Sequence, residues 1–178
     1  MARLRLIGGA WRSRVLTVPD RPGLRPTPDR VRETLFNWLG QDLTGLTCLD
    51  LFAGTGALGF EAASRGAARV ILVERDRHLA RQLEENRKAL RADEVEVITA
   101  NALECARTWS EPVDVLFLDP PYHAHWPERL EPWLDRLVRP DGSLYLESER
   151  EIETLGAWHT VKRGRAGQVH YHLLERNA

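Results

Sequence analysis

The chain has 178 residues, of which 43% are hydrophobic and 29% are charged, and its formal net charge is −1 at pH 7. This length suits one domain with a single core, and this composition excludes an intrinsically disordered protein. The sequence has no apolar run of the roughly 18 residues that a membrane span needs, no signal peptide at its start, and only two cysteines, Cys48 and Cys105. We therefore expect a cytoplasmic monomer with no membrane partner, no disulfide scaffold and no metal site.

The charge is distributed unevenly along the chain. Residues 1–32 contain eight arginines against two aspartates, whereas the remaining residues carry a net charge of −7. A split of this kind is typical of a nucleic-acid-binding arm on a body of opposite charge. Arginine outnumbers lysine 23 to 2, which suits bidentate contacts with phosphate, but genome base composition also produces such a ratio. We expect residues 1–40 to form a basic, RNA-binding extension that packs on a main domain of residues 41–178.

This extension is predicted to contain a hairpin and a helix. Residues 4–18 predict two short strands around Gly8 and Gly9, and a proline-rich link follows from 19 to 28. Thr27 before Pro28 is typical of a helix start, with threonine as the N-cap and proline at the first helical position. Apolar residues then recur at helical spacing until Gly40 ends the pattern; they are Val31, Leu35, Trp38 and Leu39.

From Leu46 onward, strand-like and helix-like segments alternate. Strands are predicted at 47–52, 69–74, 95–99, 113–118 and 142–147, helices at 57–65, 77–91, 101–108 and 128–138, and a terminal hairpin at 158–164 and 168–175. The alternation predicts a parallel sheet with helices on both faces. Because the terminal hairpin adds antiparallel strands, the expected fold class is α/β and Rossmann-like, with a mixed, mostly parallel sheet of about seven strands.

A glycine-rich turn follows the strand predicted at 47–52. Gly54, Gly56 and Gly59 match the pattern G-x-G-x-x-G, and Glu74 follows Gly54 by 20 residues. In open α/β sheets, ligands bind at the carboxyl ends of strands, where this turn is expected. Asp50 precedes the first glycine and would repel a pyrophosphate, whereas it would attract an ammonium or sulfonium group. Glu74 can accept hydrogen bonds from ribose hydroxyls in either case.

This combination resembles the nucleoside-binding half of class I S-adenosylmethionine-dependent methyltransferases. The resemblance implies S-adenosylmethionine as the cofactor. The residues expected to bind it are Asp50, Phe52, Gly54, Gly56, Gly59, Glu74, Arg75, Asn101 and Ala102. Asn101 has two interpretations, because it can read the adenine edge and it can also cap the helix that begins there.

The strand predicted at 113–118 ends in Asp119-Pro120-Pro121-Tyr122. Prolines have a fixed φ and no N–H donor, so their carbonyl groups are held in place as acceptors. Asp119 adds a carboxylate acceptor, and Tyr122 adds a flat ring that can stack on an extruded base. Two acceptors can bind the N–H bonds of an exocyclic amine, and Asp119 can stabilise the positive charge that develops on its nitrogen. These four residues are the predicted catalytic set.

The tetrapeptide resembles the motif of amino-methyltransferases that act on adenine N6, cytosine N4 or guanine N2, so it does not name the base. Two further segments resemble bacterial 16S rRNA guanine-N2 methyltransferases. They are the block from Ile7-Gly8-Gly9-Ala10-Trp11-Arg12-Ser13-Arg14 through 23–39, and the C-terminal Ala166-Gly167-Gln168-Val169. This resemblance spans nearly the whole chain. It implies methyl transfer to the exocyclic N2 of one guanine in 16S rRNA, within the small ribosomal subunit or an assembly intermediate.

The arginines of the extension are the predicted RNA contacts. Phosphates or unpaired bases are expected to meet Arg12, Arg14, Arg25, Arg30 and Arg32. The alternative is a solvated arginine face, in which Arg30 or Arg32 pairs with Glu33 or Asp29.

Three other function classes fit part of the pattern, and the most distant is a nucleotide-dependent oxidoreductase that would bind NAD at the glycine-rich turn. A DNA adenine-N6 methyltransferase shares the tetrapeptide, although this chain has little room for a target-recognition region. A non-catalytic RNA-binding assembly factor would keep the fold without the cofactor. The remaining polar residues have structural interpretations: His159, His170 and His172 on an exposed hairpin face, and Glu147 and Glu149 at a strand end. For His123 and His125, a substrate contact stays open.

Overall fold

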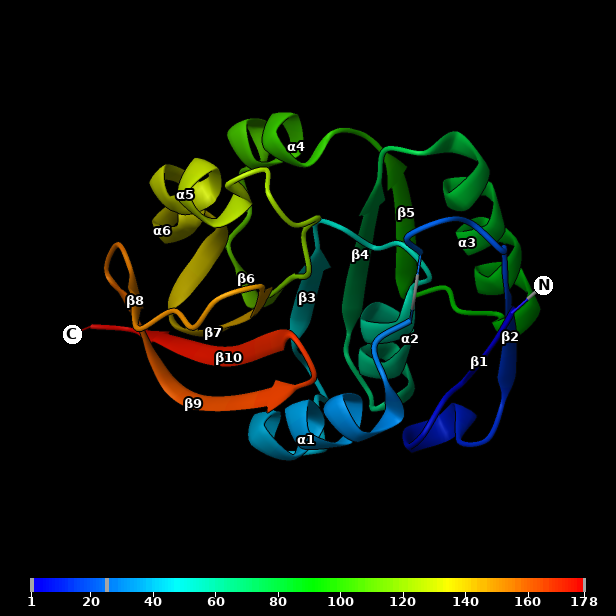
Figure 1. Cartoon of the computed structure of the whole chain (residues 1–178). Coiled ribbons are helices and arrows are strands. Elements are labelled where there is room, and N and C mark those ends of the chain that lie inside the picture. Colours follow the sequence, from blue (N-terminus) through cyan, green and yellow to red (C-terminus); the bar gives the residue numbers. More distant parts are fainter. Residues whose placement is uncertain (1, 25, 178) are drawn as a thin grey trace.

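Figure 1 shows the computed structural model of the chain, which describes residues 2–24 and 26–177. The N-terminal part comprises β1 (Ala2–Arg5), a short 3₁₀ turn η1 (Gly9–Trp11), β2 (Val15–Val18) and α1 (Asp29–Leu39). β1 and β2 pair with each other as an antiparallel two-stranded sheet. The predicted hairpin around Gly8 and Gly9 and the helix ending before Gly40 are therefore confirmed.

The rest of the chain alternates between strands and helices before it ends in antiparallel strands. In order, the elements are β3 (Thr47–Asp50), α2 (Ala57–Ser64), β4 (Arg69–Glu74), α3 (Arg77–Leu90), β5 (Val95–Thr99), α4 (Ala102–Thr108), β6 (Val113–Leu118), α5 (Trp126–Leu130), η2 (Glu131–Trp133), α6 (Leu134–Leu137), β7 (Val138–Ser148), β8 (Thr154–Leu155), β9 (Trp158–Ala166) and β10 (Val169–Arg176).

These strands form an eight-stranded sheet in the order β5-β4-β3-β6-β7-β10-β9-β8. Neighbours from β5 to β7 are parallel, and β10, β9 and β8 join antiparallel. The predicted Rossmann-like, mixed and mostly parallel sheet is confirmed. The strand beyond the expected seven is β8, whose two residues are too few to show an alternating pattern.

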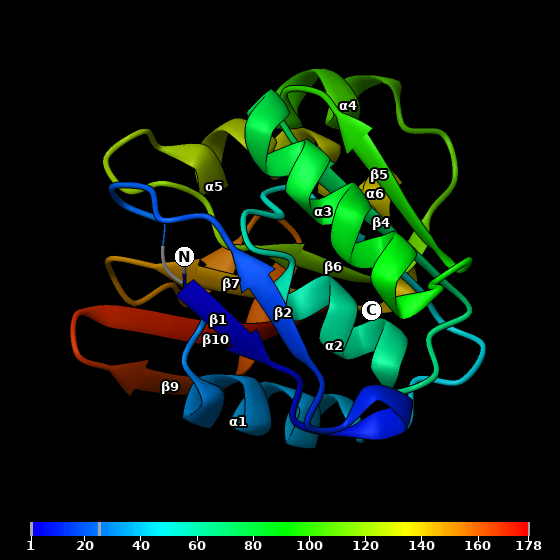
Figure 2. The same ribbon diagram turned by 90° about the vertical axis from the view of Figure 1, so that its right-hand side faces the viewer.

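Different elements cover the two faces of the sheet. In Figures 1 and 2, α1, α2, α3 and the β1–β2 hairpin lie on one side, and α4, α5 and α6 lie on the other. Within β3, Cys48 packs with the first group and Leu49 with the second. Successive side chains of a strand point to opposite faces, so the central strands are apolar throughout.

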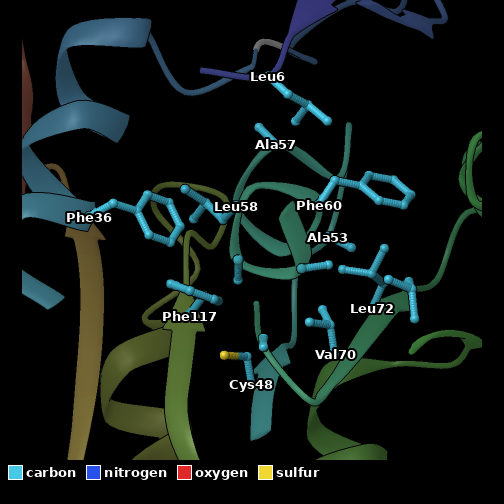
Figure 3. Packing of buried hydrophobic residues seen from close by; sticks show 14 of the residues in the cluster. Leu6, Phe36, Cys48, Ala53, Ala57, Leu58, Phe60, Val70, Leu72 and Phe117 are labelled. Carbon is cyan, nitrogen blue, oxygen red and sulfur yellow. The ribbon is translucent and has the colours of Figure 1, made fainter. Parts of the chain in front are cut away.

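The N-terminal extension shares a hydrophobic core with the main sheet. Figure 3 shows Leu6 and Phe36 around α2, in the same cluster as Phe60 of α2 and Phe117 of β6. The ring centroids of Phe36 and Phe117 lie 6.2 Å apart. The extension is thus held against the sheet by buried apolar contacts.

The prediction of one continuous helix at 128–138 was wrong, and so were both of its ends. The segment is instead divided into α5, the turn η2 and α6, and Val138 already belongs to β7. Pro132 lies in η2, where the missing N–H prevents a continuous helical hydrogen-bond ladder.

Helix α1 starts without the predicted threonine cap. Its N-cap residue is Pro28, and no side chain caps its first turn. Thr27 is buried, and its hydroxyl donates to Glu147 Oε2 at 3.4 Å. The threonine therefore links the extension to β7 instead of stabilising the helix start.

The prediction of an exposed His172 was also wrong. Its side chain is fully buried on β10, where Nδ1 bonds to the carbonyl of Leu146 and Nε2 accepts from the N–H of Ile152. Burial lowers the pKa of this histidine. The segment after β7 folds over the ring, which no local pattern of the hairpin could show.

Over residues 2–24 and 26–177, no helix is long and apolar enough to cross a membrane. In the same part of the chain, no group of three or more His, Cys, Asp or Glu side chains is placed to hold a metal ion.

Candidate active site at the carboxyl edge of the sheet

Three adjacent parallel strands bring acidic residues to one edge of the sheet. β3 lies between β4 and β6, so the connections on its two sides run in opposite directions, and such a point is the usual ligand crevice. Asp50 ends β3, Glu74 ends β4, and Asp119 follows β6. The register pairs Asp50 with Leu72 and Phe117, so Glu74 and Asp119 lie two residues further along the strands on either side of it.

The glycine-rich turn needs its glycines to pack this tightly. Gly56 has a φ of +83°, and a Cβ there would lie 2.6 Å from the ring of Phe60. A Cβ on Gly59 would lie 2.1 Å from Cδ2 of Leu72, because α2 packs directly on β4. Larger residues would push α2 and the turn away from the strand ends.

Glu74 fixes the shape of this turn. Its Oε1 accepts the N–H of Gly54 at 3.0 Å, and its Oε2 accepts the N–H of Asp76 at 2.8 Å. Asp76 in turn caps α3 by accepting from the N–H groups of His78 and Leu79. Each carboxylate oxygen of Glu74 keeps a second lone pair for a ligand hydroxyl.

Asp50 is a buried carboxyl without a cation. It is 2% exposed, accepts the N–H of Phe52 at 3.1 Å, and forms no ion pair with any Lys or Arg in the described part of the chain. Burial, reinforced by Asp119 and Glu74, raises its pKa to about 8. A cationic ligand group at this edge would therefore favour ionised Asp50.

Asp119 has an unpredicted acidic neighbour, Glu147 of β7. Leu118 and Leu146 are paired in register, which places Asp119 beside Glu147 at the ends of β6 and β7. Asp119 keeps a partly exposed surface, whereas Glu147 is 4% exposed. Desolvation raises the pKa of both, and the hydrogen bond between their carboxyl groups raises that of Glu147 and lowers that of Asp119.

The rest of the predicted catalytic loop is held from the end of β7. Pro120 is buried, while Pro121 and Tyr122 are exposed, and the tyrosine is 38% accessible. His123 and His125 have positive φ values of 64° and 54°, which is uncommon for residues other than glycine. Glu149 accepts the N–H of His123 at 3.2 Å and lies 3.0 Å from its Nδ1.

Glu147 and Glu149 lie at the end of β7, as predicted, but both also contact the loop that follows β6. For Glu147, one feature of the sequence could have indicated this contact. Glu147 interrupts the apolar run Leu144-Tyr145-Leu146 at the position that corresponds to Asp119 in the neighbouring strand.

The remaining predicted cofactor residues surround the same edge. Asn101 caps α4 by accepting the N–H of Leu103 at 2.8 Å, so its capping role is confirmed. Ala102 is buried in the first turn of that helix, and Arg75 is exposed just after β4. Phe52 is half-buried and meets Trp126 edge to face, with ring centroids 5.0 Å apart.

The link between β2 and α1 crosses this edge, as Figure 1 shows. Arg21 forms an ion pair with Asp76 at 2.8 Å at one end of the link. Leu24 packs over the glycine turn, where its Cδ1 would be 3.4 Å from a Cβ on Gly54. Thr27 reaches the acidic pair at the other end.

The predicted RNA-binding arginines are scattered. Arg12, Arg14 and Arg30 are exposed, and Arg25 lies outside the described residues. Arg14 donates to the carbonyl of Ala89 in the last turn of α3. Because α3 begins at the carboxyl edge with Arg77, and Ala89 lies twelve residues further along the helix, this contact is about 18 Å from that edge.

The prediction that Arg32 contacts RNA was wrong. Its side chain is 1% exposed and bonds to Glu61, to Asp29 and to the backbone carbonyls of Thr27 and Arg5. These internal partners use four of its five N–H donors, and its side chain is buried, so Arg32 cannot contact RNA. The alternative pairing of Arg32 with Asp29 is confirmed.

Comparison with known proteins places this architecture in a family. The family described as "Conserved hypothetical protein 95" matches residues 4–175. Ribosomal RNA small subunit methyltransferase D of Escherichia coli is 44% identical over 99% of this chain and 91% of its own length. The chain belongs to this methyltransferase family.

Solved structures agree with that assignment. A putative methyltransferase from Escherichia coli superposes with a TM-score of 0.90 at 40% identity, and 99% of each chain is covered. A putative methylase from Haemophilus influenzae gives 0.82 at 35% identity over 99% of this chain and all of its own. The family therefore shares the whole fold, including the extension and the terminal hairpin.

Proposed function

We propose that this protein transfers a methyl group from S-adenosylmethionine to the exocyclic N2 of a guanine in 16S rRNA, within the small ribosomal subunit or an assembly intermediate. It would act as a monomer in the cytoplasm. The observation that carries the proposal is the largely desolvated Asp119, which lacks a cation and lies next to Asp50 at the carboxyl edge. The name of the Escherichia coli relative, a small-subunit ribosomal RNA methyltransferase, supports the RNA substrate.

The side chains at this edge of the sheet fit S-adenosylmethionine. Asp50 offers an anionic site for a cationic group, and Glu74 offers acceptors for ribose hydroxyls. Asn101 and Ala102, at the start of α4, would read the adenine edge. The turn with Gly54, Gly56 and Gly59 lets backbone approach the cofactor, and Phe52 and Arg75 flank it. When bound, S-adenosylmethionine supplies an electrophilic methyl group.

The chain's own residues prepare the amine. Asp119 and the carbonyl of Pro120 accept its two N–H bonds, which orients the nitrogen lone pair away from the loop. The Asp119 carboxylate then stabilises the positive charge on nitrogen and accepts the proton that leaves. Pro121 stiffens the loop, and the exposed ring of Tyr122 stacks on the extruded base.

The RNA-binding assignment is narrower than the sequence suggested. We assign residues 1–40 to RNA binding through the exposed Arg12, Arg14 and Arg30, and Arg25 remains in the proposal. Since Arg12 and Arg14 lie away from the catalytic edge, they would hold rRNA that flanks the target guanine. The main domain of residues 41–178 would bind the cofactor and the base.

The decisive test is Asp119→Ala and Asp119→Asn in methyl transfer to small-subunit particles from cells lacking this activity. We expect kcat to fall about 100- to 1,000-fold, with cofactor affinity by calorimetry nearly unchanged. Nucleoside mass spectrometry should detect N2-methylguanosine in the product. The exposed Asp141→Ala is the matched control and should behave as the unsubstituted protein.

Three outcomes contradict the proposal. Methylation of duplex DNA without methylation of ribosomal particles would refute the substrate. Equal losses of turnover and cofactor affinity in Asp119→Ala would refute the role of that carboxylate. A rise in melting temperature with NAD, and none with S-adenosylmethionine, would refute the cofactor.

A further inference from the structure

Glu147 is a buried carboxyl group beside the predicted catalytic aspartate. It lies next to the last residue of β7, is 4% exposed, and shares a hydrogen bond with Asp119. Thr27 donates to its Oε2 at 3.4 Å from the link before α1. Three segments that are far apart in the sequence thus meet at one carboxyl group.

No cation neutralises this pair in the described part of the chain. The groups that face Glu147 are Asp119 from the loop after β6, Thr27 from the link, and Tyr145 on its own strand. From β10, Tyr171 is its register partner, and the ring of Tyr122 lies close enough for both carboxyl groups to influence it. The buried hydroxyl of Tyr145 makes no well-formed hydrogen bond with a described group.

Two carboxyl groups in contact, without a cation, cannot both be ionised at moderate cost. One proton is therefore shared between Asp119 and Glu147. The more buried group is the one that keeps it, because water can still solvate a charge on the partly exposed Asp119.

We propose that Glu147 is a positioning residue that donates a hydrogen bond to the Asp119 carboxylate, and that Thr27 holds Glu147 in the orientation for this bond. The inference rests on the proposed role of Asp119 as the acceptor for the amine. A carboxylate that receives a fixed hydrogen bond on one oxygen presents the other oxygen to the substrate in one orientation.

The effect of this bond on Asp119 agrees with the arrangement. Burial raises the pKa of Asp119, and the hydrogen bond from Glu147 opposes that rise. The hydrogen bond therefore acts in the direction that favours the ionised form of Asp119, which is the form that can accept from the amine. The proton released by the amine passes to Asp119 and on to solvent, so Glu147 keeps its own proton through each turnover.

A distinctive pH dependence follows. At low pH both groups are protonated and Asp119 is no longer a full acceptor, whereas at high pH both are ionised and Glu147 can no longer donate. Activity should rise and then fall as pH increases. Within the pair, the falling limb belongs to Glu147, so its disappearance on substitution of this residue identifies it.

Two substitutions separate donation from ionisation. Glu147→Gln keeps an N–H donor for Asp119 and should retain most of kcat, but its activity should not fall at high pH. Glu147→Leu removes the donor, so kcat should fall about 10- to 100-fold and the rising limb should move to higher pH. Cofactor affinity should stay unchanged in both. Glu175→Gln, an exposed carboxylate on β10, is the matched control.

A measurement on the protein alone completes the test. In protein with ¹³C-labelled carboxyl groups, the resonance absent from Glu147→Gln should have the chemical shift of a protonated acid at pH 7. An ionised Glu147 at pH 7, or Gln and Leu variants with the same pH profile as the unsubstituted protein, would overturn the inference. If Asp119→Ala is fully active, the proposed function fails instead, so the two failures are distinguishable.

Discussion

The molecule buries carboxyl groups in two regions, and their surroundings are opposite. Glu61 of α2 is completely buried, yet both of its oxygens have partners. Oε1 accepts from the N–H of Ile7 at 2.9 Å and from Arg32, and Oε2 accepts from the N–H of Gly8 at 3.0 Å and from Arg65. This cluster ties the start of the extension, α1 and α2 together.

At the carboxyl edge, Asp50, Asp119 and Glu147 are desolvated without any such cation. Burial raises the pKa values of all three. Neighbouring carboxyl groups raise those of Asp50 and Glu147 further, whereas the hydrogen bond with Glu147 lowers that of Asp119. A buried charge with matched partners is explained by the fold itself. Buried carboxyl groups that lack a cation are costly to the fold, so they point to a ligand that brings the missing positive charge.

The largest expected effect on stability comes from removing Glu61, the carboxylate of the buried cluster that contains Arg32 and Arg65. Glu61→Ala removes the buried carboxylate that pairs with Arg65 and with Arg32, which keeps only the exposed Asp29, and leaves two backbone N–H groups without an acceptor. The free energy of unfolding, measured with urea, should fall by about 3–5 kcal/mol.

The control for that change is a solvent-exposed ion pair of similar chemistry. Glu84 and Arg87 are three residues apart on α3 and partly exposed, so Glu84→Ala should cost only about 0.3–0.5 kcal/mol. At the other region, Glu147→Leu should not destabilise the protein as Glu61→Ala does. Equal losses for these two buried positions would remove the contrast between the regions.

The next effect concerns the pH dependence of stability. The pKa of Asp50 is about 8 in the folded protein against an ordinary value of 3.8, so the folded state retains a proton that the unfolded chain releases. Its contribution is favourable at low pH and is lost as pH rises from about 4 to 8. Because asparagine does not ionise, Asp50→Asn should not lose this stability as pH rises.

Thermal unfolding at pH 5 and pH 8 measures the effect. The melting temperature of Asp50→Asn relative to the unsubstituted protein should be higher at pH 8 than at pH 5. Binding of S-adenosylmethionine near pH 7 should release a proton in the unsubstituted protein, and less in the variant, when calorimetry is repeated in buffers of different ionisation enthalpy. Identical proton release by both proteins would mean that Asp50 does not meet the cationic part of the ligand.

Features that depend on a local sequence pattern were predictable from the sequence. The strands at 69–74, 95–99 and 113–118 agree with β4, β5 and β6 because a short apolar run between polar turns is a local signal. Asp50, Glu74 and Asp119 could be placed at one edge because the ends of adjacent parallel strands meet there.

Pairings between distant segments were not predictable in this way. The contact of Thr27 with Glu147 joins residues 120 positions apart, and the link that makes it has no periodic pattern. For Arg32 a signal was present, since it shares the helical spacing of the buried Val31, Leu35 and Phe36. Its charge suggested a surface position, but the buried Glu61 on another helix reverses that expectation.

The smallest expected effect concerns Asn101, a neutral side chain at the carboxyl edge that has a structural partner and a proposed ligand. Its Oδ1 accepts the N–H of Leu103, which leaves the amide Nδ2 for the adenine edge. Asn101→Ala should therefore lose about 1 kcal/mol of stability and also weaken cofactor binding. Asn101→Asp keeps the capping acceptor but replaces the amide donor, so stability should be retained.

Calorimetry of the two Asn101 variants separates the roles. If Nδ2 binds the adenine, both variants should lose cofactor affinity by about five- to tenfold, the value of one hydrogen bond, while only the alanine variant unfolds more easily. If the aspartate variant keeps full affinity, Asn101 belongs with Glu61 among residues whose polar groups serve the fold. A polar group at the ligand edge would then have a purely structural role, and the distinction between the two regions would hold only for their carboxyl groups.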